Sequence, residues 1–209
     1  MQVEYERDLH FAVTNLTTAS CSDRVAFNSV YNMESFFKGC IEMERKIPDM
    51  KLNLTDELRK KSVVLHPGVD FSQLDETPAS TDVDDRSPVI IWNHRWEYDK
   101  NPDLFFRTLF QLDDLQVDYK LVILGQSFEQ HPEIFDKTRE RLGHRLLHVG
   151  YVTEREKYYQ WLRQGTLIVS TANHEFFGIA VIEAVRAGCR PLLPNRLSYP
   201  ELFPRDYHL

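Results

Sequence analysis

The feature that most constrains the fold of this chain is a regular alternation of short apolar runs and amphipathic helical runs, which begins near residue 88. Such an alternation is typical of a parallel α/β sheet with right-handed crossovers, and it predicts a doubly wound domain. A capping box at Thr153-Glu-Arg-Glu156 is predicted to open the third helix. The predicted strands are 89–93, 120–124, 146–149, 167–170 and 190–193, and the predicted helices are 102–115, 132–142, 153–163 and 179–187.

The residues before this repeat predict a smaller α/β piece. Its expected order is helix 6–20, strand 24–28, helix 30–44 with Ser29 as its cap, short helix 55–60 and strand 62–66. Between residues 70 and 87 the composition changes to Asp, Thr, Ser and Pro, which predicts an interdomain linker. We therefore expect an N-terminal piece at 1–69, a linker at 70–87 and a larger domain at 88–209.

Composition excludes some classes of protein. The net charge is −7, from 25 Lys+Arg against 32 Asp+Glu, whereas a free-standing nucleic-acid binder is usually basic. The apolar runs are too short to cross a bilayer, and the charged N-terminus lacks the apolar core of a signal peptide. The 3 cysteines are widely spaced, which favours free thiols. We expect an intracellular protein, located in the cytoplasm, with the nucleus as a second compartment.

The candidate site follows from the predicted topology, because ligands of doubly wound sheets bind beyond the carboxyl ends of the strands. The loop after the fourth strand reads Ser170-Thr-Ala-Asn-His-Glu-Phe-Phe-Gly178 and leads into a helix. Gly178 lets the backbone approach a ligand closely, and the free amides from about Phe177 through Ala180 can hold a phosphate. We therefore place Phe177, Gly178 and Ile179 in a phosphate-binding turn.

Two carboxylates stand eight residues apart around this turn. Glu175 would face the hydroxyls of a sugar carried by the phosphate, and Glu183 could reach the hydroxyls of a ribose. On spacing alone, Glu175 could equally be a helix N-terminal charge and Glu183 a solvated one. His174 is a candidate substrate contact, although a lone loop histidine is more often structural.

The loop after the first strand adds two cations, Arg95 and Lys100, where a pyrophosphate would lie. As alternatives, Lys100 pairs with Glu97 or Asp99, and Arg95 is a surface charge. No D-x-D motif ends a predicted strand, so the cations and the helix N-terminus would supply the charge that a metal otherwise provides. We expect no metal and no cofactor.

The remaining loops are less specific. The segment Gly150-Tyr151-Val152 after the third strand is the predicted place for contacts to a base, and Val152 is the residue assigned to it. Trp92 and Trp96 are interpreted as packing residues rather than as base-stacking platforms.

At these residues the sequence resembles the retaining glycosyltransferases of the GT-B fold, family 4. The family's E-x7-E pair matches Glu175 and Glu183, and its R-x4-K pair matches Arg95 and Lys100. His66-Pro-Gly-Val-Asp70 resembles the turn that ends the family's N-terminal domain. The resemblance implies a Rossmann-like parallel-sheet domain that binds the nucleotide-sugar donor at 88–209, preceded by a remnant of a Rossmann-like N-terminal domain. It also implies that Glu175, Arg95 and Lys100 take part in catalysis.

A narrower resemblance is to the tRNA-queuosine mannosyltransferases (the glycosyltransferase-like domain-containing protein 1 group). It is carried by Asn28–Phe36, Trp92–Glu97, Ser170–Gly178 and Tyr199–Pro204. It implies transfer of mannose from the nucleotide sugar GDP-mannose to queuosine at the wobble position of tRNA for aspartate. The sequence has no membrane-facing basic or amphipathic stretch, so we expect no membrane partner. The residues themselves identify neither guanine, mannose nor tRNA.

The chain departs from the family pattern in length. Only about 70 residues precede the predicted linker, and the chain stops at Leu209, soon after the Tyr199–Pro204 motif. We therefore expect a truncated form with an incomplete acceptor site. The alternatives are an inactive fragment that binds a nucleotide or a partner protein, and a GT-B transferase with another acceptor.

Overall fold

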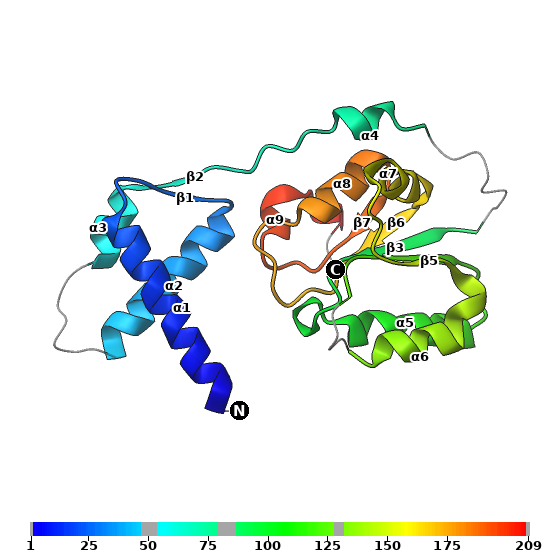
Figure 1. Ribbon diagram of the computed structural model, residues 1–209, viewed down its shortest axis with the longest axis horizontal. Helices are drawn as coiled ribbons and strands as arrows, with labels where there is room; N and C mark the ends of the chain where they lie inside the picture. Colours follow the sequence, from blue (N-terminus) through cyan, green and yellow to red (C-terminus); the bar gives the residue numbers. More distant parts are fainter. Residues whose placement is uncertain (1, 47–53, 79–86, 128–131, 208–209) are drawn as a thin grey trace. The chain divides into compact units, whose positions relative to one another are not determined.

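The computed structural model describes residues 2–46, 54–78, 87–127 and 132–207. It divides into two compact units, Met1–Gly68 and Val69–Leu209, which are considered separately (Figure 1). The strands and helices of both units lie close to the predicted ranges. Most boundaries differ by one or two residues, as expected at frayed ends, whereas the first helix begins at Gln2, four residues before its predicted start.

In its described residues, the first unit contains two parallel strands and three helices. The strands β1 (Val25–Phe27) and β2 (Ser62–Val64) pair directly. The helices are α1 (Gln2–Cys21), α2 (Val30–Lys46) and α3 (Leu54–Lys60). Ser29 caps α2 as predicted, because its hydroxyl accepts a hydrogen bond from the Asn32 amide at 3.0 Å. A small core centred on Phe27, Phe37 and Leu58 holds these elements together.

The second unit is built on a five-stranded parallel sheet with the order β5-β4-β3-β6-β7. The chain runs outward from β3 to β5, then returns to the other side of β3, which is the doubly wound arrangement. This confirms the predicted α/β fold class. The strands are β3 (Val89–Asn93), β4 (Lys120–Leu124), β5 (Leu146–Gly150), β6 (Leu167–Val169) and β7 (Arg190–Leu192).

Helices cover both faces of this sheet (Figure 1). Helices α5 (Pro102–Asp114) and α6 (Ile134–Leu142) cover one face, and α7 (Arg155–Gln164) and α8 (Ile179–Ala187) cover the other. Side chains of a strand alternate between the faces, so Val89 and Ile91 join the core under α7 and α8, whereas Ile90 and Trp92 join the core under α5. All residues of β3 are buried, as expected for a central parallel strand.

The predicted linker is wrong in its first half. Residues Ser72–Glu76 form a short helix, α4, and Leu74 is fully buried in the core beneath α7 and α8. The Arg163 guanidinium donates a hydrogen bond to the Leu74 carbonyl at 2.8 Å. A single well-placed leucine therefore ties a polar segment to the second unit. Residues 79–86 of the predicted linker lie outside the described residues.

The predicted capping box of the third helix is also wrong. Helix α7 begins at Arg155 with Glu154 at the N-cap, and no side chain caps it. The Glu154 carboxylate instead accepts a hydrogen bond from the Lys157 ammonium at 2.8 Å. The last elements are α9 (Tyr199–Leu202) and short 3₁₀ turns at Tyr98–Lys100, Gly143–Arg145 and Arg205–Tyr207.

Candidate functional site

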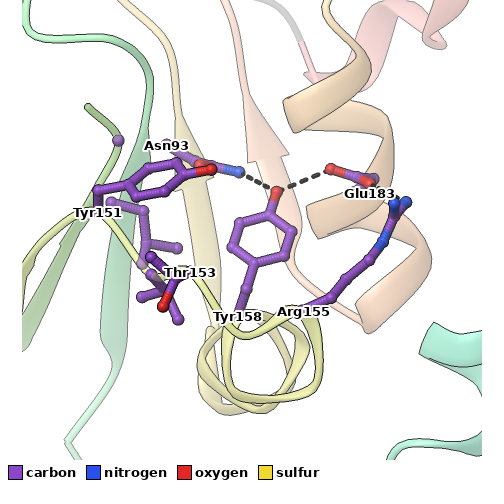
Figure 2. Close-up of a pocket in the computed structure, with 9 residues that line it drawn as sticks. Asn93, Tyr151, Thr153, Arg155, Tyr158 and Glu183 are labelled. Atoms are coloured by element: carbon purple, nitrogen blue, oxygen red, sulfur yellow. Dashed lines mark hydrogen bonds and ion pairs between the residues drawn. The ribbon is translucent and has the colours of Figure 1, made fainter.

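The strand order places a topological switch point between β3 and β6, where ligands of doubly wound sheets bind. A pocket of about 460 Å³ opens at the carboxyl ends of β3, β4 and β5. Figure 2 shows Tyr158 in this pocket between Asn93 and Glu183. The lining residues are Asn93, Leu124, Gly125, Tyr151, Val152, Thr153, Arg155, Tyr158 and Glu183.

Gly125 allows the loops after β3 and β4 to meet backbone to backbone. Its φ is +119°, and a Cβ atom there would lie 1.9 Å from the His94 carbonyl oxygen. Only glycine fits both the conformation and the space. The inner wall of the pocket therefore depends on residue 125 being a glycine.

The Glu183 carboxylate lies at one end of the site, among hydroxyl groups. The Tyr158 hydroxyl is 2.7 Å from Glu183 Oε2, and the Tyr159 hydroxyl is 3.5 Å from Oε1. The Arg155 guanidinium forms an ion pair with Oε1 at 3.7 Å. The Arg155 side chain is 60% exposed, so this ion pair is largely solvated.

The Glu175 carboxylate lies at the other end, beside a buried cation. The Lys100 ammonium is 3.5 Å from Glu175 Oε2 and 3.1 Å from Asp99 Oδ2, and it donates to the His174 carbonyl at 2.7 Å. The Lys100 side chain is only 9% exposed. These three contacts match the three donor hydrogens of a lysine. Lys100 is therefore a fully partnered, buried cation.

The loop that carries Glu175 is fixed from several sides. The Asn173 amide donates to the Asp99 carbonyl, and the Thr171 hydroxyl to the Lys100 carbonyl. The Arg196 guanidinium donates to the Ala172 carbonyl and to the Asn173 side chain, both at 3.0 Å. These bonds hold the loop against the segment that contains Lys100.

The turn before α8 is shaped by Gly178, which has a φ of +88°. A Cβ atom at Gly178 would lie 3.3 Å from the Tyr199 ring. Glu175 Oε1 accepts from the Phe176 amide at 3.1 Å and from the Phe177 amide at 3.4 Å. The Val181 amide donates to the Gly178 carbonyl at 3.0 Å. The Ile179 and Ala180 amides precede the first intrahelical hydrogen bonds among the described residues, and they make an electropositive end for α8.

His94 is buried near Lys100 and Asp99. The pKa of His94 is lowered from 6.5 to about 3, chiefly by burial and also by the nearby Lys100 ammonium, while Asp99 opposes the shift. The imidazole is therefore neutral over the physiological range. Its Nε2 atom has no hydrogen-bond partner within the described part of the chain.

The structure groups the predicted site residues unevenly. Val152 and Glu183 line the pocket, whereas Lys100 contacts His174 and Glu175 at the other end. The buried Phe177 and the half-exposed Ile179 flank Gly178 at the start of α8. The functional roles assigned to these residues stay predictions.

Arg95 does not share the surroundings of Lys100. Its guanidinium pairs with Glu97 at 3.1 Å, and its side chain is 58% exposed. Of the alternatives considered for the two cations, pairing of Lys100 with Asp99 and an exposed position for Arg95 both describe the structure.

Trp92 and Trp96 are core residues, as interpreted from the sequence. Both are buried, and the Trp96 ring stacks on Phe135 with 4.2 Å between the ring centroids. Four polar residues of the site were not predicted from the sequence: Asn93, Arg155, Tyr158 and Tyr159. Asn93 could have been found as the polar residue that ends an apolar strand, but no local pattern indicates that the two tyrosines contact Glu183.

Two further observations apply to the described ranges alone. No cluster of three or more His, Cys, Asp or Glu side chains there has the arrangement needed to bind a metal ion. Likewise, no helix within those ranges combines the length and apolar character required to cross a membrane.

Comparison with known proteins agrees with this geometry. Residues 1–69 match the model of the tRNA-queuosine alpha-mannosyltransferase N-terminal region, and residues 74–207 match the glycosyl transferases group 1 model. The chain is 38% identical over 208 residues to the tRNA-queuosine alpha-mannosyltransferase of Drosophila melanogaster. The match covers 96% of this chain and 55% of that protein, so the chain spans about half the length of this relative.

Solved structures of low sequence identity share the fold. Anabaena HepE in complex with UDP and glucose matches with a TM-score of 0.65 at 16% identity, over 95% of this chain and 52% of HepE. Sucrose-phosphate synthase from Thermosynechococcus elongatus matches with a TM-score of 0.65 at 16% identity, over 89% of this chain and 44% of the synthase. These neighbours are GT-B glycosyltransferases. The group 1 model covers most of the chain, and the chain therefore belongs to the glycosyl transferases group 1 family.

Proposed function

We propose that this chain binds GDP-mannose as the donor half of a mannosyltransferase that acts on queuosine in tRNA. The proposal is supported by the match of residues 1–69 to the queuosine-specific N-terminal model and by the similarity to the Drosophila enzyme. It is also supported by the site, which combines a pocket at the sheet edge with a helix N-terminus. Nucleotide sugar and tRNA are the proposed partners.

The donor would lie across the carboxyl edge of the sheet. Glu183 would accept the ribose hydroxyls, and Val152 would contact the base from the loop after β5. The diphosphate would lie against the turn formed by Phe177, Gly178 and Ile179, where helix amides favour negative charge. The mannose would then be placed near His174 and Glu175.

The contacts of Lys100 suggest how Lys100 and Glu175 respond to a bound donor. All three donor hydrogens of its ammonium are in use, and the contact to Glu175, at 3.5 Å, is the longest. A phosphate oxygen that replaced this contact would take over one donor of Lys100. Glu175 would then be free to accept a sugar hydroxyl. One exchange of partners would therefore engage both residues with the donor.

The same arrangement supports a mechanism that needs no metal. Charge that develops on the leaving diphosphate would be stabilised by Lys100, by Arg95 and by the α8 amides, which are fixed before the reaction. We propose that transfer retains the configuration of mannose, with the leaving phosphate taking the proton of the attacking hydroxyl. No metal-binding residue is required in this scheme.

The observation that carries the proposal is the buried Lys100–Glu175 pair beside the electropositive start of α8. The test is calorimetric titration of the chain with GDP-mannose and GDP, with a chelator present. We expect Glu175→Gln to bring the affinity for GDP-mannose close to that for GDP, because the lost carboxylate acts on the sugar. An unchanged preference for GDP-mannose would contradict the assignment of Glu175.

Arg95→Ala tests the exposed cation. Weaker binding of both GDP and GDP-mannose is expected, by about tenfold, which is the usual scale for one charge-assisted hydrogen bond. Arg107→Ala is the matched control, because Arg107 is an exposed arginine on α5 that pairs with Asp103. Equal affinities of the two variants would remove Arg95 from the site.

Transfer itself is tested by incubating the chain with GDP-mannose and queuosine-containing tRNA, and then detecting mannosylated queuosine by mass spectrometry. tRNA that lacks queuosine is the control. Donor binding without transfer would restrict the function of this chain to binding the donor.

A further inference from the structure

We infer that Tyr158 and Tyr159 are positioning residues that orient the Glu183 carboxylate, so that the pocket selects a nucleotide with free ribose hydroxyls. Two neighbouring tyrosines on α7 each bond to a different oxygen of the same carboxylate. The inference deepens the proposed function and rests on it. It concerns how the ribose is recognised, not which sugar is transferred.

The direction of the hydrogen bonds at Oε2 is determined by chemistry. The Asn93 side-chain amide nitrogen is a donor only, and it lies 2.8 Å from the Tyr158 hydroxyl. The hydroxyl oxygen must therefore accept from Asn93, which leaves its own proton for Glu183 Oε2 at 2.7 Å. The Asn93 nitrogen also donates to the Ala180 carbonyl at 3.2 Å. This relay connects β3, α7 and α8 (Figure 2).

A second relay has the same direction at Oε1. The Arg155 Nε atom, again a donor only, lies 2.7 Å from the Tyr159 hydroxyl. Tyr159 therefore directs its proton toward Glu183 Oε1 at 3.5 Å. The Tyr159 side chain is completely buried, so its hydroxyl has a fixed position. Both oxygens of Glu183 thus accept a hydrogen bond from a tyrosine hydroxyl that itself accepts one from a second donor.

These hydrogen bonds determine which groups a ligand must present to Glu183. Each group that bonds to Glu183 is a donor, and burial raises the pKa of Tyr158 so that its hydroxyl stays protonated. An ionised carboxylate has lone pairs left over on both oxygens. A ligand that approaches them must therefore present donors, and a phosphate would be repelled. Two adjacent ribose hydroxyls meet this requirement, one for each oxygen.

The experiment compares two probes, GDP and 2′,3′-dideoxy-GDP, by calorimetric titration of the 209-residue chain. We expect the wild-type chain to bind GDP at least about tenfold more tightly, because the dideoxy probe has no hydroxyl to donate to the lone pairs left on Glu183. Tyr158→Phe keeps the ring but removes the hydroxyl that donates a hydrogen bond to Glu183 Oε2. It is expected to weaken GDP binding by about tenfold and to leave the affinity for the dideoxy probe unchanged, so that the discrimination collapses.

Tyr159→Phe is expected to reduce the same ratio by a smaller factor, because its contact to Glu183 is longer. Tyr119→Phe is the matched control: its buried hydroxyl donates to the Leu109 carbonyl on the other face of the sheet, so the variant should keep the wild-type ratio. If the two probes lose affinity in parallel in Tyr158→Phe, the tyrosine has only a structural role and the inference is overturned.

The two proposals can fail separately. A wild-type chain that binds UDP or ADP but not GDP overturns the choice of GDP-mannose, and the ribose ratio is then measured with the bound nucleotide. Equal binding of GDP and the dideoxy probe by the wild-type chain overturns the tyrosine inference while the donor proposal stands. A chain that binds none of the three nucleotides overturns both.

Discussion

The two carboxylates of the site are the same residue type, yet the structure surrounds them with different chemistry. Glu175 lies against a buried ammonium, whereas Glu183 lies against two neutral hydroxyls and an exposed guanidinium. We call Glu175 and its partners the charged end, and Glu183 and its partners the hydroxyl end. At the charged end, the buried partners depend on each other for neutralisation. At the hydroxyl end, each partner can be removed without leaving a buried charge alone.

This difference has a functional consequence. The charged end can exchange an internal ion pair for contacts with a ligand, because Lys100 has no spare donor until Glu175 releases it. The hydroxyl end needs no exchange, because Glu183 keeps free lone pairs in the unliganded state. We therefore expect the charged end to rearrange on binding and the hydroxyl end to be preformed.

The largest effect is expected from Gly125→Ala, which disturbs both ends at once. The new Cβ atom would clash with the His94 carbonyl, and the positive φ would be strained as well. We expect a loss of about 4 kcal/mol or more in the free energy of unfolding, measured by urea denaturation. Gly150→Ala is the control, because its φ is +126° but a Cβ atom there has nothing within 4 Å. Equal losses in the two variants would show that strain, and not the clash, dominates.

Lys100→Met is expected to have the next largest effect and to act on the charged end alone. It leaves the Asp99 and Glu175 carboxylates partly buried without their cation. Removing one partner of a buried pair costs about 3 kcal/mol of unfolding free energy. The double variant Lys100→Met, Glu175→Gln should recover part of that loss, and an absence of recovery would contradict the pairing.

The charged end should also be sensitive to acid through His94. Its pKa is lowered from 6.5 to about 3 in the folded chain, so the unfolded chain binds a proton that the folded chain refuses. The contribution of neutral His94 to the free energy of unfolding is therefore fully present above pH 6.5. It is lost progressively as the pH drops from 6.5 toward 3. The expected slope is about 1.4 kcal/mol per pH unit below 6.5.

Urea denaturation between pH 7.5 and 5.5 measures this slope before the carboxylates titrate. Replacing His94 by glutamine should flatten the slope, whereas His144→Gln should leave it unchanged, since His144 is an exposed histidine. A wild-type slope near zero would show that His94 takes up a proton in the folded chain.

The smallest effect is expected from Arg155→Met at the hydroxyl end. Arg155 is mostly exposed, and its partners stay hydrogen-bonded or neutral without it. We expect less than about 1 kcal/mol of lost unfolding free energy, in contrast to Lys100→Met. A loss as large as that of Lys100→Met would remove the distinction between the two ends.

Most of the fold could be predicted because its signals are local. The strands of the sheet stand out as apolar runs, and their carboxyl ends indicate the edge where the pocket lies. The α4 helix could not be predicted, because it depends on one buried leucine in a polar segment. Its stability comes from contacts with α7, which are distant in sequence.

The site was predicted less completely for the same reason. The motif residues Glu175 and Glu183 are found by spacing, and both face polar partners in the structure. The direction of a loop side chain, however, depends on partners that spacing does not reveal, so Arg95 and Lys100 looked equivalent. The contact between Asn93 and Tyr158 joins residues 65 positions apart, and no local pattern indicates it.

The burial of Leu74 decides where the second unit of this chain can be cut out as a separate domain. Asp75, the residue after it, binds the Arg186 guanidinium on α8 through both carboxylate oxygens, at 3.0 and 2.8 Å. An excised domain that begins at residue 88 would lose this clamp and leave a hole beneath α7 and α8. A domain that begins at Val69 keeps both, and it is therefore the natural unit for crystallisation and binding studies.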